Sequence, residues 1–268
     1  MELRFNSKKY IKRILDLPFY LIPSWKKPIV IYYHSVNNTN HKSHKIENFE
    51  SQLKWLINNN YTFVRADQLH QVKNNKKIIC LTFDDGYLDN FEIVLPLLLK
   101  YNIKATFFIV SSWFSISRSK RHHSYDLDFM TKNHIKLLHE HGMEIGSHTH
   151  SHRQATDLFK DSKQDFIIDI NKNKSILESI INDKVTSFAY PNGQKGSFNN
   201  HTNDILFNYF NVIFSTIHNT YYPCKRFNGR IEMSHLDDLI DFKAKLNGRR
   251  RYLFYFQNII NQSKRWYN

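Results

Sequence analysis

The sequence predicts an α/β protein built on a parallel β-sheet, either open or closed into a barrel. Short apolar runs rich in β-branched and aromatic residues alternate with segments of helical periodicity, and the connections between them are short. About seven such runs occur, a number that suits a barrel. A chain of 268 residues is also long enough to bury a sizeable core.

The elements follow from composition and periodicity. The expected strands are Ile29–Tyr33, Thr62–Val64, Ile78–Phe83, Ala105–Val110, Glu144–Ser147, Thr186–Ala189 and Val212–Ser215. Helices are expected over Glu47–Asn59, Asp89–Lys100, Asn199–Phe210, Leu236–Leu246 and Arg250–Asn261. Pro96 is expected to kink the second of these helices. Thr131 is expected to cap a helix that ends at Gly142, and Ser162 to cap a long helix that reaches Ile181.

The charge is strongly basic, with 38 Lys and Arg residues against 24 Asp and Glu residues, for a net charge of +14. Much of the excess lies at the two ends, where aromatic residues are interleaved. We therefore divide the chain into a basic N-terminal segment (1–27), a barrel domain (28–248) and a basic amphipathic C-terminal helix (249–268). Such ends suit an anionic membrane surface. Alternatively, they are solvated tails that pack their aromatic residues on the domain.

The sequence has no apolar stretch of about 18 residues that would span a membrane. The short apolar run Ile14–Pro23 is not followed by a small-residue cleavage site. We therefore expect a protein that is cytoplasmic or peripheral on the inner membrane. No nucleic-acid partner is expected, because no recognised binding motif accompanies the positive charge.

Asp84 and Asp85 follow the apolar run Ile78–Phe83 directly. Two adjacent carboxylates at the end of a buried strand are costly unless their charge is compensated. A metal ion on one carboxylate would do this and leave the other free as a base. The alternative is a strand-to-helix turn in which Gly86 supplies the backbone freedom.

Three histidines in five residues, His148, His150 and His152, follow the expected strand Glu144–Ser147. Imidazole is the commonest nitrogen ligand for zinc and related metals. His148 and His152 are four residues apart, so both can reach one metal from a tight turn. With one carboxylate they make a two-histidine, one-aspartate site with open positions for water and substrate. This leaves His150 outside the metal shell; the alternative is a surface histidine cluster.

Two weaker runs also end strands. Tyr190-Pro191-Asn192-Gly193 follows Thr186–Ala189, and His34 follows Ile29–Tyr33. Taken alone, the first is a turn and the second a structural histidine. In a parallel barrel the carboxyl ends of the strands meet at one rim, so all four runs are expected to converge on one pocket.

The runs 82–86 and 148–152 resemble the first two motifs of the polysaccharide deacetylase family (carbohydrate esterase family four, as in chitooligosaccharide deacetylases). The resemblance extends from about Pro28 to Ile231. It implies a distorted (β/α) barrel, with Asp84 as catalytic base and with Asp85, His148 and His152 as metal ligands.

The resemblance also implies the reaction: hydrolysis of a carbon–nitrogen bond other than a peptide bond. The expected enzyme removes acetyl from an N-acetylated amino sugar in a polysaccharide or a lipid-linked saccharide. One divalent metal ion is implied, Zn²⁺ in the first place, with Co²⁺, Ni²⁺ or Fe²⁺ as alternatives. Other amides, O-acetyl esters, or an inactive relative that binds glycan or membrane remain alternatives.

The third family motif is incomplete, because Ala189 stands where the family carries the arginine that contacts the base. We expect Arg230 to supply that cation from a late strand. The family's oxyanion donor, a backbone N–H, aligns with Asn192, which retains the N–H. Tyr190, Asn192 and Arg230 are therefore the expected oxyanion and substrate residues.

The general acid is also displaced from its usual place. The family's last motif, a Leu-x-His type strand near the C-terminus, has only a poor copy ending at His235. Ile31-Tyr32-Tyr33-His34 has the right shape at the N-terminus, as in a circularly permuted member. We expect His34 to be the acid, with His235 and His218 as alternatives.

Overall fold

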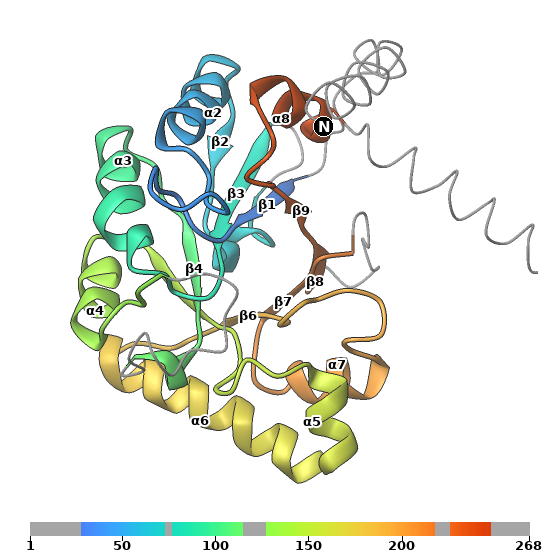
Figure 1. Cartoon of the computed structure of the whole chain (residues 1–268). Coiled ribbons are helices and arrows are strands. Elements are labelled where there is room, and N and C mark those ends of the chain that lie inside the picture. The colour runs from blue at the N-terminus through green and yellow to red at the C-terminus, as the bar shows by residue number, and fades with distance from the viewer. Residues whose placement is uncertain (1–27, 73–76, 115–126, 218–225, 248–268) are drawn as a thin grey trace, which may run out of the picture. The chain divides into compact units, whose positions relative to one another are not determined.

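The computed structural model describes residues 28–72, 77–114, 127–217 and 226–247 (Figure 1). The described residues belong to two compact units, Lys27–Leu236 and a second unit whose described part is Asp237–Asn247. The basic segment 1–27, the C-terminal helix 249–268 and His218 lie outside the described residues. The boundaries proposed for these parts stay predictions, and nothing described supports the predicted membrane contact. No described helix is both long enough and apolar enough to cross a membrane.

One parallel sheet forms the centre of the larger unit. Within the described ranges its nine strands are β1 (Ile29–Tyr33), β2 (Thr62–Phe63), β3 (Ile78–Phe83), β4 (Thr106–Ile109), β5 (Glu144–Ser147), β6 (Ser187–Ala189), β7 (Val212–Ser215), β8 (Phe227–Gly229) and β9 (Ile231–Glu232). Their order is β8-β7-β6-β5-β4-β3-β1-β9, and β2 pairs with β3. The seven predicted strands are confirmed to within one residue at each end. β8 and β9 are additional to them.

Arg230 alone separates the two outer strands of this order. β8 pairs with β7, with Phe227 opposite Ile213, whereas β9 pairs with β1, with Ile231 opposite Ile31. The segment 227–232 therefore borders both edges of the sheet and bends at Arg230. The result is a nearly closed parallel barrel (Figure 1), which confirms the predicted distorted (β/α) barrel.

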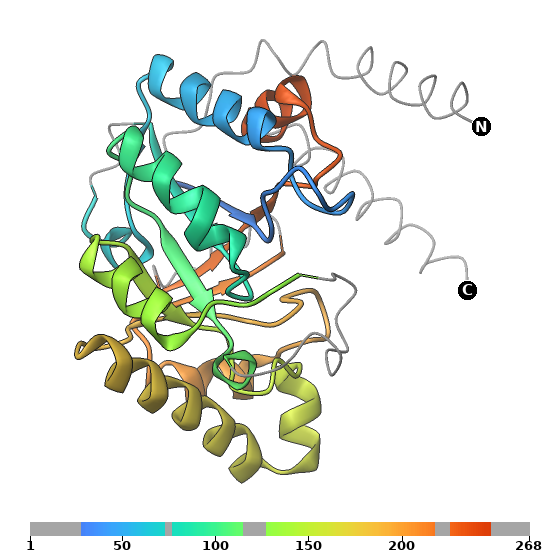
Figure 2. The same cartoon turned by 60° about the vertical axis from the view of Figure 1, so that its left-hand side comes forward.

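Helices surround this sheet (Figures 1 and 2). In the larger unit they are α2 (Ile46–Asn58), α3 (Leu95–Lys100), α4 (Lys132–Glu140), α5 (Ala155–Asp161), α6 (Lys163–Ile181) and α7 (Asn200–Leu206), with the short 3₁₀ turns η2 (Ala66–Gln68) and η4 (Ser111–Trp113). The described part of the second unit holds α8 (Leu239–Leu246). Both predicted caps are present, because the side chains of Thr131 and Ser162 accept hydrogen bonds from the first turns of α4 and α6.

The predicted helix over Asp89–Lys100 is present as one unbroken helical run, but it is not α-helical throughout. A π-helical turn, Asn90–Val94, comes first and continues directly into the α-helix α3 at Leu95. Pro96 lies just after this turn, and the kink expected there stays a prediction. The helix α5 was not predicted.

Alternation along the strands divides the core into two layers. Cys80, Phe108 and Phe214 belong to a buried cluster that fills the barrel interior, together with Ala189. The interior is so narrow that a Cβ on Gly146 would lie 2.4 Å from the ring of Phe108.

The second layer is aromatic and packs the outer face of the sheet against α2. The rings of Phe83 and Phe107 stack 4.9 Å apart, and Phe83 stacks on Tyr33 at 5.5 Å. Phe49 of α2 meets both Phe83 and Tyr33 edge-on. These two layers hold β1, β3 and β4 in fixed register, and thereby fix the positions of the residues at their ends.

Candidate active site

The predicted convergence of strand ends is present in the barrel. β1 and β3 are in register, with Tyr33 opposite Phe83, so His34 and Asp84 follow side by side. The N–H of Asp84 donates to the carbonyl of Tyr33 at 3.0 Å, which continues the ladder into the site. β5 and β6 end beside each other in the same way, with Ser147 opposite Phe188. Residues from strands far apart in sequence therefore meet at one rim.

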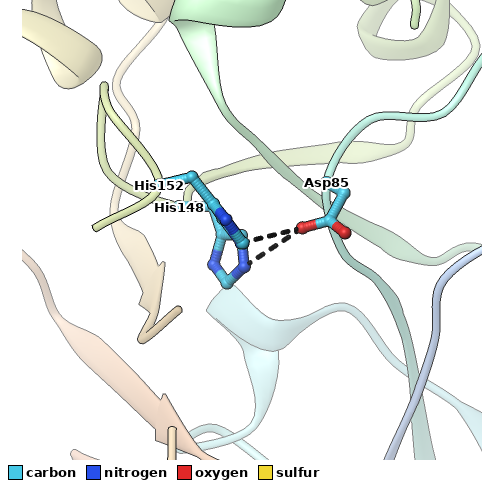
Figure 3. A group of neighbouring side chains, drawn as sticks. All are labelled: Asp85, His148 and His152. Atoms are coloured by element: carbon cyan, nitrogen blue, oxygen red, sulfur yellow. Dashed lines mark ion pairs between the residues drawn. The ribbon is translucent and has the colours of Figure 1, made fainter. Parts of the chain in front are cut away.

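Asp85, His148 and His152 form a group of three potential ligands (Figure 3). The Nε2 atoms of His152 and His148 lie 3.2 and 3.5 Å from Oδ1 of Asp85. One ligand atom from each residue lies within 4.8 Å of the other two. Oδ1 of Asp85 is buried yet accepts no hydrogen bond, as expected of an atom placed for a cation. One carboxylate oxygen and two imidazole nitrogens suit a divalent transition metal such as zinc.

The backbone that carries these ligands is bent into unusual conformations. Asp85 has φ of 76° and His152 has φ of 58°, both in the left-handed region, and Thr149 between the histidines has φ of 64°. Residues other than glycine adopt such angles at a cost, and they cluster at functional sites. The turns after β3 and β5 thus direct the side chains toward a common point.

Hydrogen bonding prepares His148 for ligation. Its Nδ1 donates to the carbonyl of Ala189 at 2.8 Å, which leaves Nε2 unprotonated toward Asp85. Burial lowers the pKa of His148 to about 4, so the ring is neutral at pH 7. A neutral imidazole is the form that binds metals.

Asp85 and His152 stabilise each other's charged forms. Burial alone would raise the pKa of Asp85, but the charge of His152 outweighs it and lowers that pKa below its usual range. Burial likewise opposes the charge of His152, but Asp85 raises the pKa of this histidine. Without a cation between them, the two side chains therefore form an ion pair.

Asp84 faces the barrel interior and pairs with Arg230. The guanidinium donates two hydrogen bonds to the carboxylate, at 2.6 and 2.7 Å, and its Nη1 lies 3.2 Å from Oγ1 of Thr82. Burial would raise the pKa of Asp84, but the charge of Arg230 lowers it overall, so the carboxylate is ionised. Arg230 is itself fully buried, and its Cζ lies 4.6 Å from the ring centre of Tyr32.

Arg230 lies where it can replace the arginine that is missing at Ala189. Ala189 belongs to the interior cluster with Phe108, and the guanidinium of Arg230 lies 5.3 Å from the ring centre of Phe108. The cation that the third motif lacks thus enters the barrel from the bend between β8 and β9.

His34 lies at the same rim, directly after β1. Asn90 donates to its carbonyl at 2.8 Å, and its ring meets Tyr32 edge-on at 5.6 Å. His34 is among the charges that lower the pKa of both aspartates. The alternative acid His235 follows β9 after three residues and is half-buried.

The expected oxyanion residue lies on the turn after β6. Asn192 is exposed, with φ of 59°, and its carbonyl accepts a hydrogen bond from Thr216 at 2.7 Å. No described residue accepts a hydrogen bond from its N–H, which leaves that donor available. Tyr190 differs, because its side chain is fully buried and its hydroxyl donates to Asn203 at 2.9 Å. Only the backbone of Tyr190 lies at the rim.

One feature of the site was not anticipated. Trp113 of η4 lies against the ligand group, with its ring centre 4.7 Å from that of His152 and 4.5 Å from that of Phe129. Its position just after the strand Ala105–Val110 could have indicated that it lies at the same rim. His150 lies outside the ligand group, as expected, with Nδ1 2.8 Å from Oγ of Ser111.

A parallel barrel with an ion-paired carboxylate beside an Asp-His-His group at its carboxyl rim defines a class of barrel hydrolases. The chain belongs to the polysaccharide deacetylase family, whose family model matches residues 71–208. Members of this family are metal-dependent hydrolases of carbon–nitrogen bonds other than peptide bonds, and they act on N-acetylated polysaccharides.

Individual relatives agree with this assignment. YxkH of Bacillus subtilis, which carries a provisional designation as a polysaccharide deacetylase, is 30% identical over 63% of this chain and 57% of its own length. The poly-β-1,6-N-acetyl-D-glucosamine N-deacetylase of Staphylococcus aureus is 30% identical over 54% of this chain and 52% of its own length. The chain therefore spans little more than half the length of these curated relatives. The solved structure of IcaB from Ammonifex degensii shares the fold, with a TM-score of 0.69 and 21% identity over 84% of this chain and 98% of that chain.

Proposed function

We propose that this chain is a metal-dependent N-deacetylase that releases acetate from N-acetylglucosamine units of a polysaccharide. The observation that carries the proposal is the ionised, Arg230-paired carboxylate of Asp84 directly beside the separate ligand group of Asp85, His148 and His152. One carboxylate is thereby free to act as a base while its neighbour is placed to hold a cation. The similarity to the Staphylococcus aureus enzyme named for poly-β-1,6-N-acetyl-D-glucosamine supports this substrate class.

Asp85, His148 and His152 would hold the divalent cation, with Zn²⁺ as the first candidate. Such a cation, when bound, polarises an acetyl carbonyl and lowers the pKa of water. The neutral ring of His148 and the ionised carboxylate of Asp85 are already in the protonation states that ligation requires. The site thus needs no proton release from these two groups on loading.

The remaining steps belong to the protein's own groups. The carboxylate of Asp84 takes a proton from the attacking water, and Arg230 keeps that carboxylate ionised beforehand. The N–H of Asn192 donates to the oxyanion that develops on the acetyl oxygen, a contribution of roughly 10²–10³ in rate. His34 gives a proton to the departing amine, so that acetate and a free amino sugar leave.

The Arg230–Asp84 pair also bears on the alternative of an inactive relative. That alternative drew its support from the arginine missing at Ala189. Because a buried arginine from another strand makes the same kind of contact, the missing residue is not a reason to expect inactivity.

The test is the variant Asp84→Asn, which keeps the shape of the side chain and removes its basicity. We expect acetate release from N-acetylglucosamine oligomers to fall by roughly 10²–10⁴, while metal content stays that of the wild type. Asp183→Asn is a matched control, because Asp183 is exposed and precedes β6 at the opposite end of the barrel. Wild-type turnover by Asp84→Asn with the metal retained would sink the proposal.

The choice of substrate needs a second comparison. The wild-type protein should release acetate from β-1,6-linked N-acetylglucosamine oligomers faster than from O-acetylated glycans of similar length. The opposite preference would show an esterase. Treatment with a chelator should abolish either activity, and Zn²⁺ or Co²⁺ should restore it.

A further inference from the structure

We propose that Asp169 of α6 is a positioning residue for the cation site, an inference that rests on the proposed function. Its carboxylate does not reach the ligand group. It holds the loop that joins His148 to His152 and thereby fixes the separation of the two rings.

The contacts of Asp169 are with backbone rather than with side chains. Oδ1 accepts a hydrogen bond from the N–H of His150 at 2.7 Å, and Oδ2 accepts one from the N–H of Ser151 at 3.1 Å. The side chain is buried, with 8% of its surface exposed. Hydrogen bonds from N–H groups to a buried carboxylate are stronger than those to a neutral acceptor.

The two bonded amides lie at the critical part of the loop. Thr149 precedes them and His152 follows them, and both of these residues have left-handed backbone angles, 64° and 58°. Such a conformation persists only where surrounding contacts enforce it. One carboxylate can accept both N–H groups only while they point the same way, so it selects the bent form of the loop.

A second side chain of α6 acts one turn further along, on the same face of the helix. Asn173 is fully buried, and its Nδ2 donates to the carbonyl of Ile109 at 3.0 Å and to Oγ of Ser147 at 2.8 Å. Its Oδ1 accepts the N–H of Ser111 at 2.9 Å. Asn173 thus ties the end of β4 to the residue that directly precedes His148.

Together the two residues connect α6 to both ends of the ligand loop. Asn173 fixes where the loop begins, at Ser147, and Asp169 fixes how it bends before His152. The long helix lies along the outside of the barrel (Figure 2) and is capped at its start by Ser162, so it provides a rigid support. Groups that orient ligands in this way typically change metal affinity 10- to 100-fold when they are removed.

The test is Asp169→Asn, which keeps one acceptor oxygen and turns an NH₂ group toward the other backbone N–H. We expect the Kd for Zn²⁺, measured by calorimetry on the chelator-treated full chain, to rise 10- to 100-fold. The absorption spectrum of the Co²⁺-loaded protein should also shift, because the ligand geometry changes. A residue with a merely structural role would lower stability without changing either quantity in the folded protein.

Asp165→Asn is the matched control. Asp165 lies one turn earlier on α6 and is exposed, so the same change of charge on the same helix should leave the Zn²⁺ affinity unaltered. Circular dichroism and urea unfolding of both variants establish that the folded states are being compared.

A measurement on the wild-type protein covers the case in which Asp169→Asn does not fold. In the metal-free chain, the amide hydrogens of His150 and Ser151 should exchange much more slowly than those of exposed loops. Fast exchange at both amides would overturn the inference, as would wild-type Zn²⁺ affinity in Asp169→Asn. If only this inference is wrong, the wild-type protein still binds Zn²⁺ and releases acetate. If the wild-type protein binds no metal, the proposed function is overturned as well.

Discussion

Replacing Arg230 with Met would remove the cation from the barrel interior while keeping much of the volume of the side chain. The arginine is fully buried, and its two hydrogen bonds to Asp84 measure 2.6 and 2.7 Å. Asp84 would then be a buried carboxylate that has lost its two hydrogen bonds from a guanidinium. We therefore expect a large loss of stability as well as a loss of deacetylation.

The size of this effect can be worked out in two ways. Hydrogen bonds to charged groups contribute about 1.5–3 kcal/mol each, so two of them give about 3–6 kcal/mol. Breaking a buried ion pair by removing one partner costs about 3–5 kcal/mol. The two figures agree, and for a chain of this size they correspond to a fall in Tm of about 6–24 °C.

The assay is urea unfolding of the metal-free protein, carried out as a double-mutant cycle. The variants are Arg230→Met, Asp84→Asn and the two combined. Each single variant leaves one unpartnered polar group, whereas the double variant leaves no unpaired charge. We expect the double variant to be more stable than the sum of the single effects predicts, by about 2–3 kcal/mol.

Additivity of the two single effects would refute the reasoning, because it would mean that the pair contributes no coupling. Arg230→Lys provides a milder comparison, since it keeps the charge but cannot make the two-pronged contact. It should lie between the wild type and Arg230→Met in stability. If Arg230→Lys were as unstable as Arg230→Met, packing rather than charge would account for the loss.

Two further predictions concern the acid and a buried glutamate. His34→Gln should lower acetate release by roughly 10²–10⁴ with Zn²⁺ affinity unchanged, whereas His235→Gln should lower it little; the reverse order in a steady-state assay would reassign the acid. Burial and the nearby charge of Asp67 raise the pKa of Glu144 from 4.5 to about 7, so the folded state keeps a proton that the unfolded state releases. The stability from this group is full below about pH 4.5 and is lost as pH rises through 7, by at most about 3 kcal/mol. The free energy of unfolding in urea should therefore fall less between pH 5 and pH 8 for Glu144→Gln than for the wild type. An equal fall in the two proteins would contradict the prediction.

The strands that carry the site were predictable because their sequences favour one structure at every level. Ile78–Phe83 is apolar, β-branched or aromatic throughout and ends in a polar turn, so pattern and propensity agree. Phe227–Gly229 and Ile231–Glu232 are too short for such a signal, and the first contains a glycine. Their extended form is imposed by pairing with β7 and β1, which no local pattern records.

In the site, too, residues next to a strand were predictable from the sequence around them, whereas contacts between distant parts of the chain were not. Asp84, Asp85, His148 and His152 each follow a strand, so local reading places them together. The contact between Arg230 and Asp84 spans 146 residues, and it was predicted only because the family resemblance implies a cation beside the base that Ala189 cannot supply. Asp169 was missed because its partners are backbone groups, and a helical aspartate gives no sequence signal for them.

The bend at Arg230 has a consequence for the order in which the molecule becomes functional. A nascent chain that emerges from the ribosome presents Asp84 and both histidines long before it presents Arg230. Until that last segment bridges the two edges of the sheet, the catalytic carboxylate has no counter-charge and the barrel has an open seam. Because Arg230 lies at the junction of the two outer strands, closing the seam and neutralising the interior depend on the same short segment. A barrel without this segment in place would have neither a closed sheet nor a paired catalytic carboxylate.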